Sequence, residues 1–168
     1  MFKSTLTPEE LDSFNAIHTR IFPRRKKRYE TYQINSIKKS SKSTINPIIK
    51  KAFDILDSNG TKNYDKNNYL AEFHQRNCGF EKKKYGHFDW HTDDGGATSY
   101  LVYSVLFYLR KDNTVSGGNL EYEINKTKFV HEVKQGDILS FRGDIKHYPQ
   151  PTEGFGCRDI IVVFVKRT

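Results

Sequence analysis

The stretch Gly136-Asp137-Ile138-Leu139-Ser140-Phe141 shows the pattern that indicates the fold class, an apolar run that begins directly after a Gly-Asp turn. Gly and Asp favour turns, and short runs of β-branched and aromatic residues between turns are typical of strands. The pattern repeats after residue 65 and predicts strands at 69–76, 85–93, 99–109, 119–124, 127–133, 137–142 and 158–166. Strands spaced this closely favour an antiparallel sandwich or jelly roll.

A helix is predicted close to the N-terminus. Thr7 suits the N-cap, Pro8 the first helical position, and Glu10 the end of a capping box. Apolar residues then recur at helical spacing, at Leu11, Phe14, Ile17 and Ile21. Pro23 is expected to end the helix.

A second helix is predicted from Asn46 as cap and Pro47 at the first position, with an apolar face up to Leu56 and a stop at Gly60. Residues 29–37 are expected to form a strand, and the Lys/Ser-rich residues 38–45 a loop. We therefore expect a mostly β fold with N-terminal helices. Residues 1–168 form one domain in this interpretation, with 1–65 as helical support and basic segment and 66–168 as the jelly-roll body.

The composition bounds the class of protein. A chain of 168 residues can bury a core of its own. Cys78 and Cys157 are too few for a disulfide scaffold, and we expect free thiols. With no signal-peptide core in residues 1–5 and no apolar run of about 18 residues, we expect a cytoplasmic or nuclear protein with no membrane partner.

Positive charge is concentrated in one segment. The formal net charge is +8, and residues 20–51 carry eleven Lys and Arg against a single acid, Glu30. The densest cluster is Arg24, Arg25, Lys26, Lys27 and Arg28. A solvated face is the favoured interpretation of this cluster, and contact with nucleic-acid phosphates is the alternative.

Three residues are candidate metal ligands: His91, Asp93 and the distant His147. Two histidines and one carboxylate can hold Fe(II) on one face of an octahedron and leave three positions open. Residues i and i+2 of a strand point to the same face, so His91 and Asp93 would converge. The upstream His87 and Asp89 have the same spacing, but Asp94-Gly95-Gly96 follows the second pair and favours a position at a strand end.

From Tyr85 onward the chain resembles the prolyl-hydroxylase-like branch of the 2-oxoglutarate/Fe(II)-dependent dioxygenases, which share a double-stranded β-helix (jelly-roll, cupin-like) fold. The resemblance rests on five motifs in order. They are His91-Thr92-Asp93, the strand ending in Tyr108-Leu109, the Gly117-Gly118 turn, Gly136-Asp137-Ile138-Leu139-Ser140-Phe141 before His147, and Gly156-Cys157-Arg158 before the last strand.

The resemblance implies catalytic and metal-binding roles for His91, Asp93 and His147. It implies that Arg158 and Tyr108 bind the distal carboxylate of 2-oxoglutarate, which suits the planar, permanently charged guanidinium of arginine. Fe(II), 2-oxoglutarate and O2 would be required, with ascorbate left open as a further cofactor. Two positions depart from the family pattern: Phe88 replaces a frequent tyrosine, and Ile160 replaces a frequent hydroxyl residue.

These features lead to three hypotheses about function. The favoured one is hydroxylation of a protein or peptide side chain with release of succinate and CO2. The second is a nucleic-acid dealkylating dioxygenase, which the basic segment favours, although Phe164 stands where that branch carries a second arginine. The third is a non-catalytic jelly-roll binding module, which gives no reason for metal ligands and an anion-binding arginine at this spacing.

Overall fold

The computed structural model describes residues 1–21, 32–36, 42–78, 89–95 and 101–167. The described residues form two helices, α1 (Pro8–Ile21) and α2 (Lys42–Ser58), together with eleven strands. The strands are β1 (Phe2–Thr5), β2 (Tyr32–Ser36), β3 (Tyr69–Cys78), β4 (Leu101–Lys111), β5 (Val115–Gly117), β6 (Leu120–Ile124), β7 (Thr127–His131), β8 (Asp137–Arg142), β9 (His147–Pro149), β10 (Thr152–Gly154) and β11 (Gly156–Lys166).

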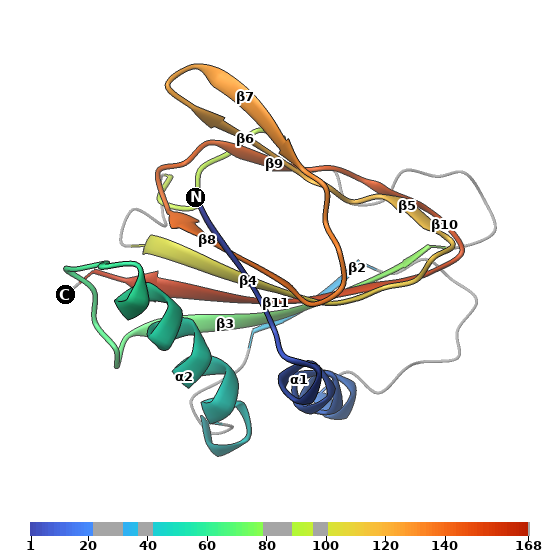
Figure 1. The fold of residues 1–168 in the computed structure, drawn as a ribbon, viewed down its shortest axis with the longest axis horizontal. Coiled ribbons are helices and arrows are strands. Elements are labelled where there is room, and N and C mark those ends of the chain that lie inside the picture. Colours follow the sequence, from blue (N-terminus) through green and yellow to red (C-terminus); the bar gives the residue numbers. More distant parts are fainter. Residues whose placement is uncertain (22–31, 37–41, 79–88, 96–100, 168) are drawn as a thin grey trace.

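Two layers of antiparallel strands face each other. The large sheet has the order β1-β8-β4-β11-β3-β2. Opposite it lie the β7-β6-β9 sheet and the β10-β5 pair, while both helices cover the outer face of the large sheet (Figure 1). This arrangement confirms the predicted mostly β, jelly-roll fold with N-terminal helices.

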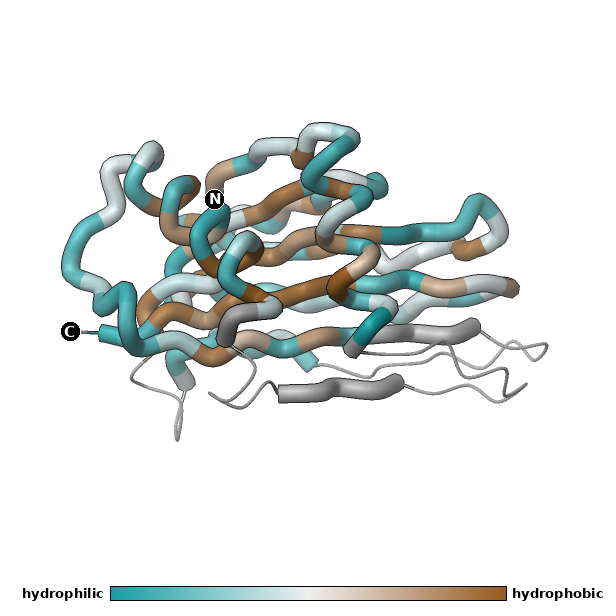
Figure 2. The backbone as a smooth tube through the Cα atoms, turned by 90° about the horizontal axis from the view of Figure 1, so that it is seen from below, coloured by the Kyte–Doolittle hydropathy of each residue, from teal (hydrophilic) through white to brown (hydrophobic). Residues whose placement is uncertain are grey.

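The large sheet separates two apolar cores. Along β11, Ile161, Val163 and Val165 join the core beneath the helices, whereas Ile160 and Val162 join a second core between the two layers. This alternation follows from the two-residue period of a strand. Figure 2 shows the hydrophobic stretches gathered along neighbouring central strands and the hydrophilic ones toward the loops. We call the space between the two layers the interior.

The N-terminal helix begins as predicted. The backbone N–H of Thr7 donates to Glu10 Oε2 at 3.0 Å, and the N–H of Glu10 donates to Thr7 Oγ1 at 3.2 Å, so the capping box is formed. Helix α1 ends at Ile21 in the described part of the chain. Pro23 and the basic cluster 24–28 lie outside the described residues.

The predicted start of the second helix is wrong, because α2 begins at Lys42 and contains Pro47 in its interior. Residues 42–45 are therefore helical rather than part of a loop. The longer helix places Ile45, which is 2% exposed, in the same core as Ile48 and Ala52. Burial of this face outweighs the cost of an internal proline, which is about 3 kcal/mol. The stop at Gly60 is confirmed, with φ of 68° and an N–H that donates to Asp57 O at 2.9 Å.

Most of the predicted strands are present, with ends shifted by a few residues. The exception is 85–93, where the described residues 89–93 form one isolated bridge at His91 and a turn. The N-terminal part also contributes β1 and β2 to the large sheet, beyond the helical support expected of it. Cys157 forms no disulfide with another described residue. The side chain of Cys78 lies outside the described residues, so the expected free thiols stay a prediction. Among the described residues, neither helix is long and apolar enough to cross a membrane.

Candidate active site

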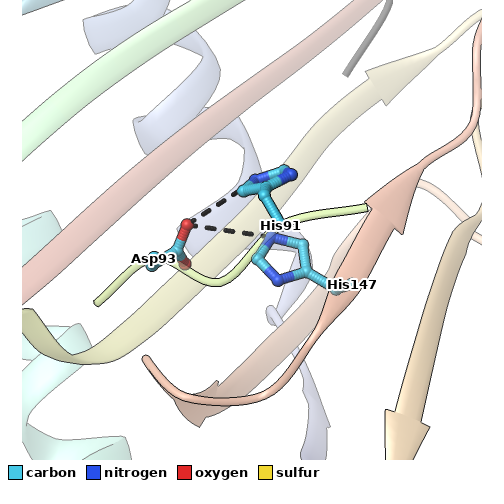
Figure 3. Close-up of side chains that lie close together, drawn as sticks. All are labelled: His91, Asp93 and His147. Carbon is cyan, nitrogen blue, oxygen red and sulfur yellow. Dashed lines mark ion pairs between the residues drawn. The ribbon is translucent and has the colours of Figure 1, made fainter. Parts of the chain in front are cut away.

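The three predicted metal ligands come together at one end of the roll. Ligand atoms of His91, Asp93 and His147 all lie within 4.8 Å of one another (Figure 3). Asp93 Oδ1 is 3.8 Å from Nε2 of His91 and 3.8 Å from Nε2 of His147. The side chains of Asp93 and His147 are 10% and 5% exposed, whereas that of His91 is 36% exposed. One side of the cluster is therefore open.

Both imidazoles are oriented by backbone carbonyls two residues earlier. Nδ1 of His91 lies 2.8 Å from Asp89 O, and Nδ1 of His147 lies 3.0 Å from Ile145 O. Since a carbonyl can only accept, each Nδ1 donates its N–H, and in the neutral imidazole Nε2 is then the nitrogen with a lone pair on the side of Asp93. This orientation is the usual second-sphere support of a metal-binding histidine.

Asp93 is oriented from the large sheet. The hydroxyl of Ser104, a fully buried residue of β4, donates to Asp93 Oδ2. Oδ1 remains directed at the two imidazoles. One oxygen of the Asp93 carboxylate is thus held by Ser104, and the other is available to bind a cation.

Asp93 reaches this position from a turn, so the expected strand geometry of the pair is wrong. The N–H groups of Asp93 and Asp94 both donate to Gly143 O, at 2.9 and 3.2 Å. A Cβ on Gly143 would lie 2.8 Å from Leu101 O, so only glycine permits this close approach. In the alternative pair, His87 lies outside the described residues, and the exposed Asp89 contributes its carbonyl to His91.

The electrostatics of the cluster favour ligation. Burial lowers the pKa of His147, and the neighbouring His91 adds to this effect, while Asp93 opposes it. A neutral imidazole is the form that binds a metal ion. Two imidazoles and one carboxylate with an open side are the donor set of non-haem Fe(II) centres, so the residues present fit that ion.

Arg158 lies in the interior, on the same face of β11 as Ile160 and Val162. It is 2% exposed, and its Nη1 donates to the carbonyl oxygen of Gly118 in the opposite layer. Tyr108 pairs with Ile160 across β4 and β11, is 2% exposed and belongs to the interior core. Ser104 and Tyr108 share this face of β4, so the cluster and Arg158 lie toward opposite ends of one interior.

A second cation accompanies Arg158. Lys111 is its cross-strand partner on β4, and Lys111 Nζ donates to Val133 O at 3.4 Å. Burial lowers the pKa of Lys111, and the positive charge of Arg158 adds to this effect. Two neighbouring cations that are partly shielded from water favour the binding of an anion beside them.

Thr152 completes this end of the interior. Its side chain is fully buried, and Oγ1 has no hydrogen-bond partner among the residues that the structure describes. A Cβ placed on Gly118, where φ is 69°, would lie 2.6 Å from Arg158 Nη1 and 2.7 Å from Thr152 Cγ2. Glycine at 118 therefore lets the guanidinium and the threonine approach each other. A buried hydroxyl without a partner beside buried cations fits a carboxylate ligand.

Sequence reasoning missed Ser104, Lys111, Gly143 and Thr152. The two-residue alternation of β4 could have placed Ser104 and Tyr108 on one face. Thr152 and Gly143 act through contacts with residues distant in the chain, for which the sequence contains no signal.

The architecture defines the class: a two-layered jelly roll with a His-Asp-His cluster in its interior. No family model and no curated protein sequence matches the chain. Solved structures with the same fold include a Pseudomonas putida prolyl-4-hydroxylase, with a TM-score of 0.70 and 13% identity over 99% of this chain and 92% of that chain.

Two further similar structures were solved with a co-substrate or a peptide bound. The viral collagen prolyl hydroxylase of Paramecium Bursaria Chlorella virus-1, solved as a 2OG complex, has a TM-score of 0.61 and 17% identity over 99% of this chain and 95% of that chain. A Trichoplax adhaerens prolyl hydroxylase in complex with a hypoxia inducible factor peptide fragment has a TM-score of 0.70 and 12% identity, covering 99% and 83%. The chain thus has the fold of prolyl hydroxylases and 2OG-Fe(II) oxygenases, as the sequence resemblance predicted.

Proposed function

We propose that this protein is an Fe(II)- and 2-oxoglutarate-dependent dioxygenase that hydroxylates a protein or peptide side chain and releases succinate and CO2. The observation that carries the proposal is the cluster of His91, Asp93 and His147, whose two Nε2 atoms and one carboxylate oxygen converge with one side open. This cluster shares one interior with the buried Arg158.

The residues of the site would have the following roles. His91, Asp93 and His147 would hold Fe(II). The hydrogen bond from Ser104 to Oδ2 of Asp93 would leave Oδ1 to bind the ion. Arg158 would bind the distal carboxylate of 2-oxoglutarate, together with Tyr108, the charge of Lys111 and the hydroxyl of Thr152. Bound iron and 2-oxoglutarate would supply the oxidation of a C–H bond by O2, and the protein would orient the reactants and exclude water.

A peptide is the favoured substrate because one similar structure is a collagen prolyl hydroxylase and another is a prolyl hydroxylase in complex with a peptide fragment. Nucleic-acid dealkylation is the second candidate, favoured by the cations of residues 20–51. Against it, Phe164 packs against the interior core where a second arginine would be expected. A binding module without catalysis would leave the oriented imidazoles unexplained.

The proposal is tested by incubating the purified protein with Fe(II) and 2-oxoglutarate and screening peptide and oligonucleotide panels. We expect succinate formation together with a 16 Da mass increase in a peptide. Loss of a methyl group from an alkylated base would favour the second candidate. Absence of any 2-oxoglutarate turnover or binding in the wild type, with metal bound, would contradict both.

A further inference from the structure

A charged cleft lies beside the metal cluster. It has a volume of about 460 Å³ and is lined by three cations, Lys62, Arg142 and Arg167, and two carboxylates, Asp94 and Asp144. Tyr103 and its neighbours at the start of β4 contribute the apolar part of the wall. The cations come from the segment after α2, the end of β8 and the segment after β11, so three distant parts of the chain meet here.

The cleft and the metal cluster share a wall. Gly143 O accepts the N–H groups of Asp93 and Asp94, and Gly143 N donates to Val102 O at 2.8 Å. Asp94 and Val102 both line the cleft, whereas Asp93 belongs to the cluster. A group bound in the cleft therefore lies beside Asp94, the residue that directly follows the proposed iron ligand Asp93 in the chain. The cleft thus adjoins the end of the roll where the cluster lies.

The charges of the cleft favour a monoanion. Arg142 donates to Asp144, so this pair is largely neutral. Lys62 and Arg167 form no ion pair with a carboxylate among the residues that the structure describes. Two cations then face the single carboxylate of Asp94, a balance that suits a carboxylate better than a doubly charged phosphate.

We propose that this cleft binds an aspartate or glutamate side chain of the peptide substrate, close in sequence to the residue that is oxidised. The inference rests on the proposed function and adds to it a substrate class, acidic peptides. Lys62 and Arg167 are specificity-determining residues in this interpretation. Arg142 holds Asp144 away from the bound carboxylate.

The test uses a pool of synthetic peptides with randomised residues around each potential target. The wild type is incubated with the pool, Fe(II) and 2-oxoglutarate, and peptides heavier by 16 Da are sequenced by mass spectrometry. We expect Asp or Glu to be enriched at one fixed distance from the oxidised residue. The double variant Lys62→Gln/Arg167→Gln should lose this enrichment, whereas Lys50→Gln/Lys134→Gln, with the same change in charge, should keep it.

A binding measurement separates specificity from turnover. With Mn(II) in place of iron, the Kd of one selected peptide is compared with that of its Glu→Gln or Asp→Asn analogue by fluorescence anisotropy. Exposed and half-exposed ion pairs each contribute little to the binding free energy. We therefore expect the Kd of the neutral analogue to be about three- to tenfold higher than that of the acidic peptide in the wild type, and the two Kd values to be equal in Lys62→Gln/Arg167→Gln. Oxidised peptides without acidic enrichment, or enrichment that survives in the double variant, would overturn the inference alone. Absence of oxidised peptides would overturn the proposed function on which it rests.

Discussion

His91 and His147 form a doubly hydrogen-bonded backbone pair: His91 N donates to His147 O at 3.0 Å, and His147 N donates to His91 O at 2.8 Å. Opposite residues of an antiparallel pair point to the same side, which brings the two ring centroids to 4.3 Å from each other. The pair joins the segment 89–95 to β9, so the position of one imidazole fixes that of the other.

The first prediction concerns this pair. Anaerobic addition of Fe(II) and 2-oxoglutarate should give a weak visible charge-transfer band, and His91→Ala or His147→Ala should abolish it, since two remaining ligands hold the ion poorly. The control is His74→Ala, a histidine of β3 that contacts Glu72 instead. If His87→Ala abolishes the band and His91→Ala does not, the upstream pair binds the metal.

The second prediction concerns Ser104. Ser104→Ala should weaken Fe(II) or Mn(II) binding by about 10- to 100-fold, the usual effect of removing an outer-sphere partner of a metal ligand. Ser140→Ala is the matched control, because Ser140 is equally buried on β8 and its hydroxyl accepts from Asn59 Nδ2 at 3.3 Å. Isothermal titration with Mn(II) measures the difference. Equal affinities in the two variants would remove Ser104 from the site.

The capping box of α1 could be predicted because its signal is local. Thr7 and Glu10 are three residues apart and satisfy each other's N–H groups. The start of α2 could not be predicted from Pro47, because burial of Ile45 against the sheet decides it. Strand alternation likewise predicted that His91 and Asp93 converge, but Asp93 is positioned differently, because its N–H donates to Gly143 O in a distant loop.

The third prediction concerns Arg158. Arg158→Met keeps an unbranched apolar side chain and removes the guanidinium and its charge. It should raise the Kd for 2-oxoglutarate at least 30-fold, because losing a buried charge-assisted contact costs about 2–5 kcal/mol. Metal affinity should change little. Thermal stabilisation by 2-oxoglutarate in the Mn(II)-loaded protein is the measurement, with Lys50→Met on the surface of α2 as control. Unchanged 2-oxoglutarate binding would transfer the role to another cation, with Lys111, the cross-strand partner of Arg158, as the candidate. Arg142 and Lys146 are exposed and do not lie beside Arg158.

The fourth prediction separates stability from ligand binding at Thr152. Thr152→Val preserves the shape and removes a buried hydroxyl that has no partner among the described residues, so the unliganded protein should gain about 1 kcal/mol and roughly 2–4 °C in Tm. Binding of 2-oxoglutarate should weaken at least tenfold, since a hydrogen bond to a charged group contributes about 1.5–3 kcal/mol. Thr152→Ser should restore binding. A variant that is more stable and binds 2-oxoglutarate as tightly as the wild type would show that the hydroxyl contacts no ligand.

The last prediction separates peptide from nucleic-acid substrates through the basic cluster 24–28. A phosphate-binding surface loses affinity steeply as salt rises, with about one logarithmic unit of slope for each phosphate contact. We expect weak oligonucleotide binding at physiological salt, because the five charges contain no aromatic residue that could stack on a base, although Tyr29 and Tyr32 follow. Neutralising Arg24, Arg25, Lys26, Lys27 and Arg28 should therefore leave peptide turnover unchanged. Tight, salt-sensitive oligonucleotide binding that this variant loses, together with demethylation of an alkylated base, would establish the nucleic-acid alternative, because the cluster would then hold the substrate that the metal centre oxidises.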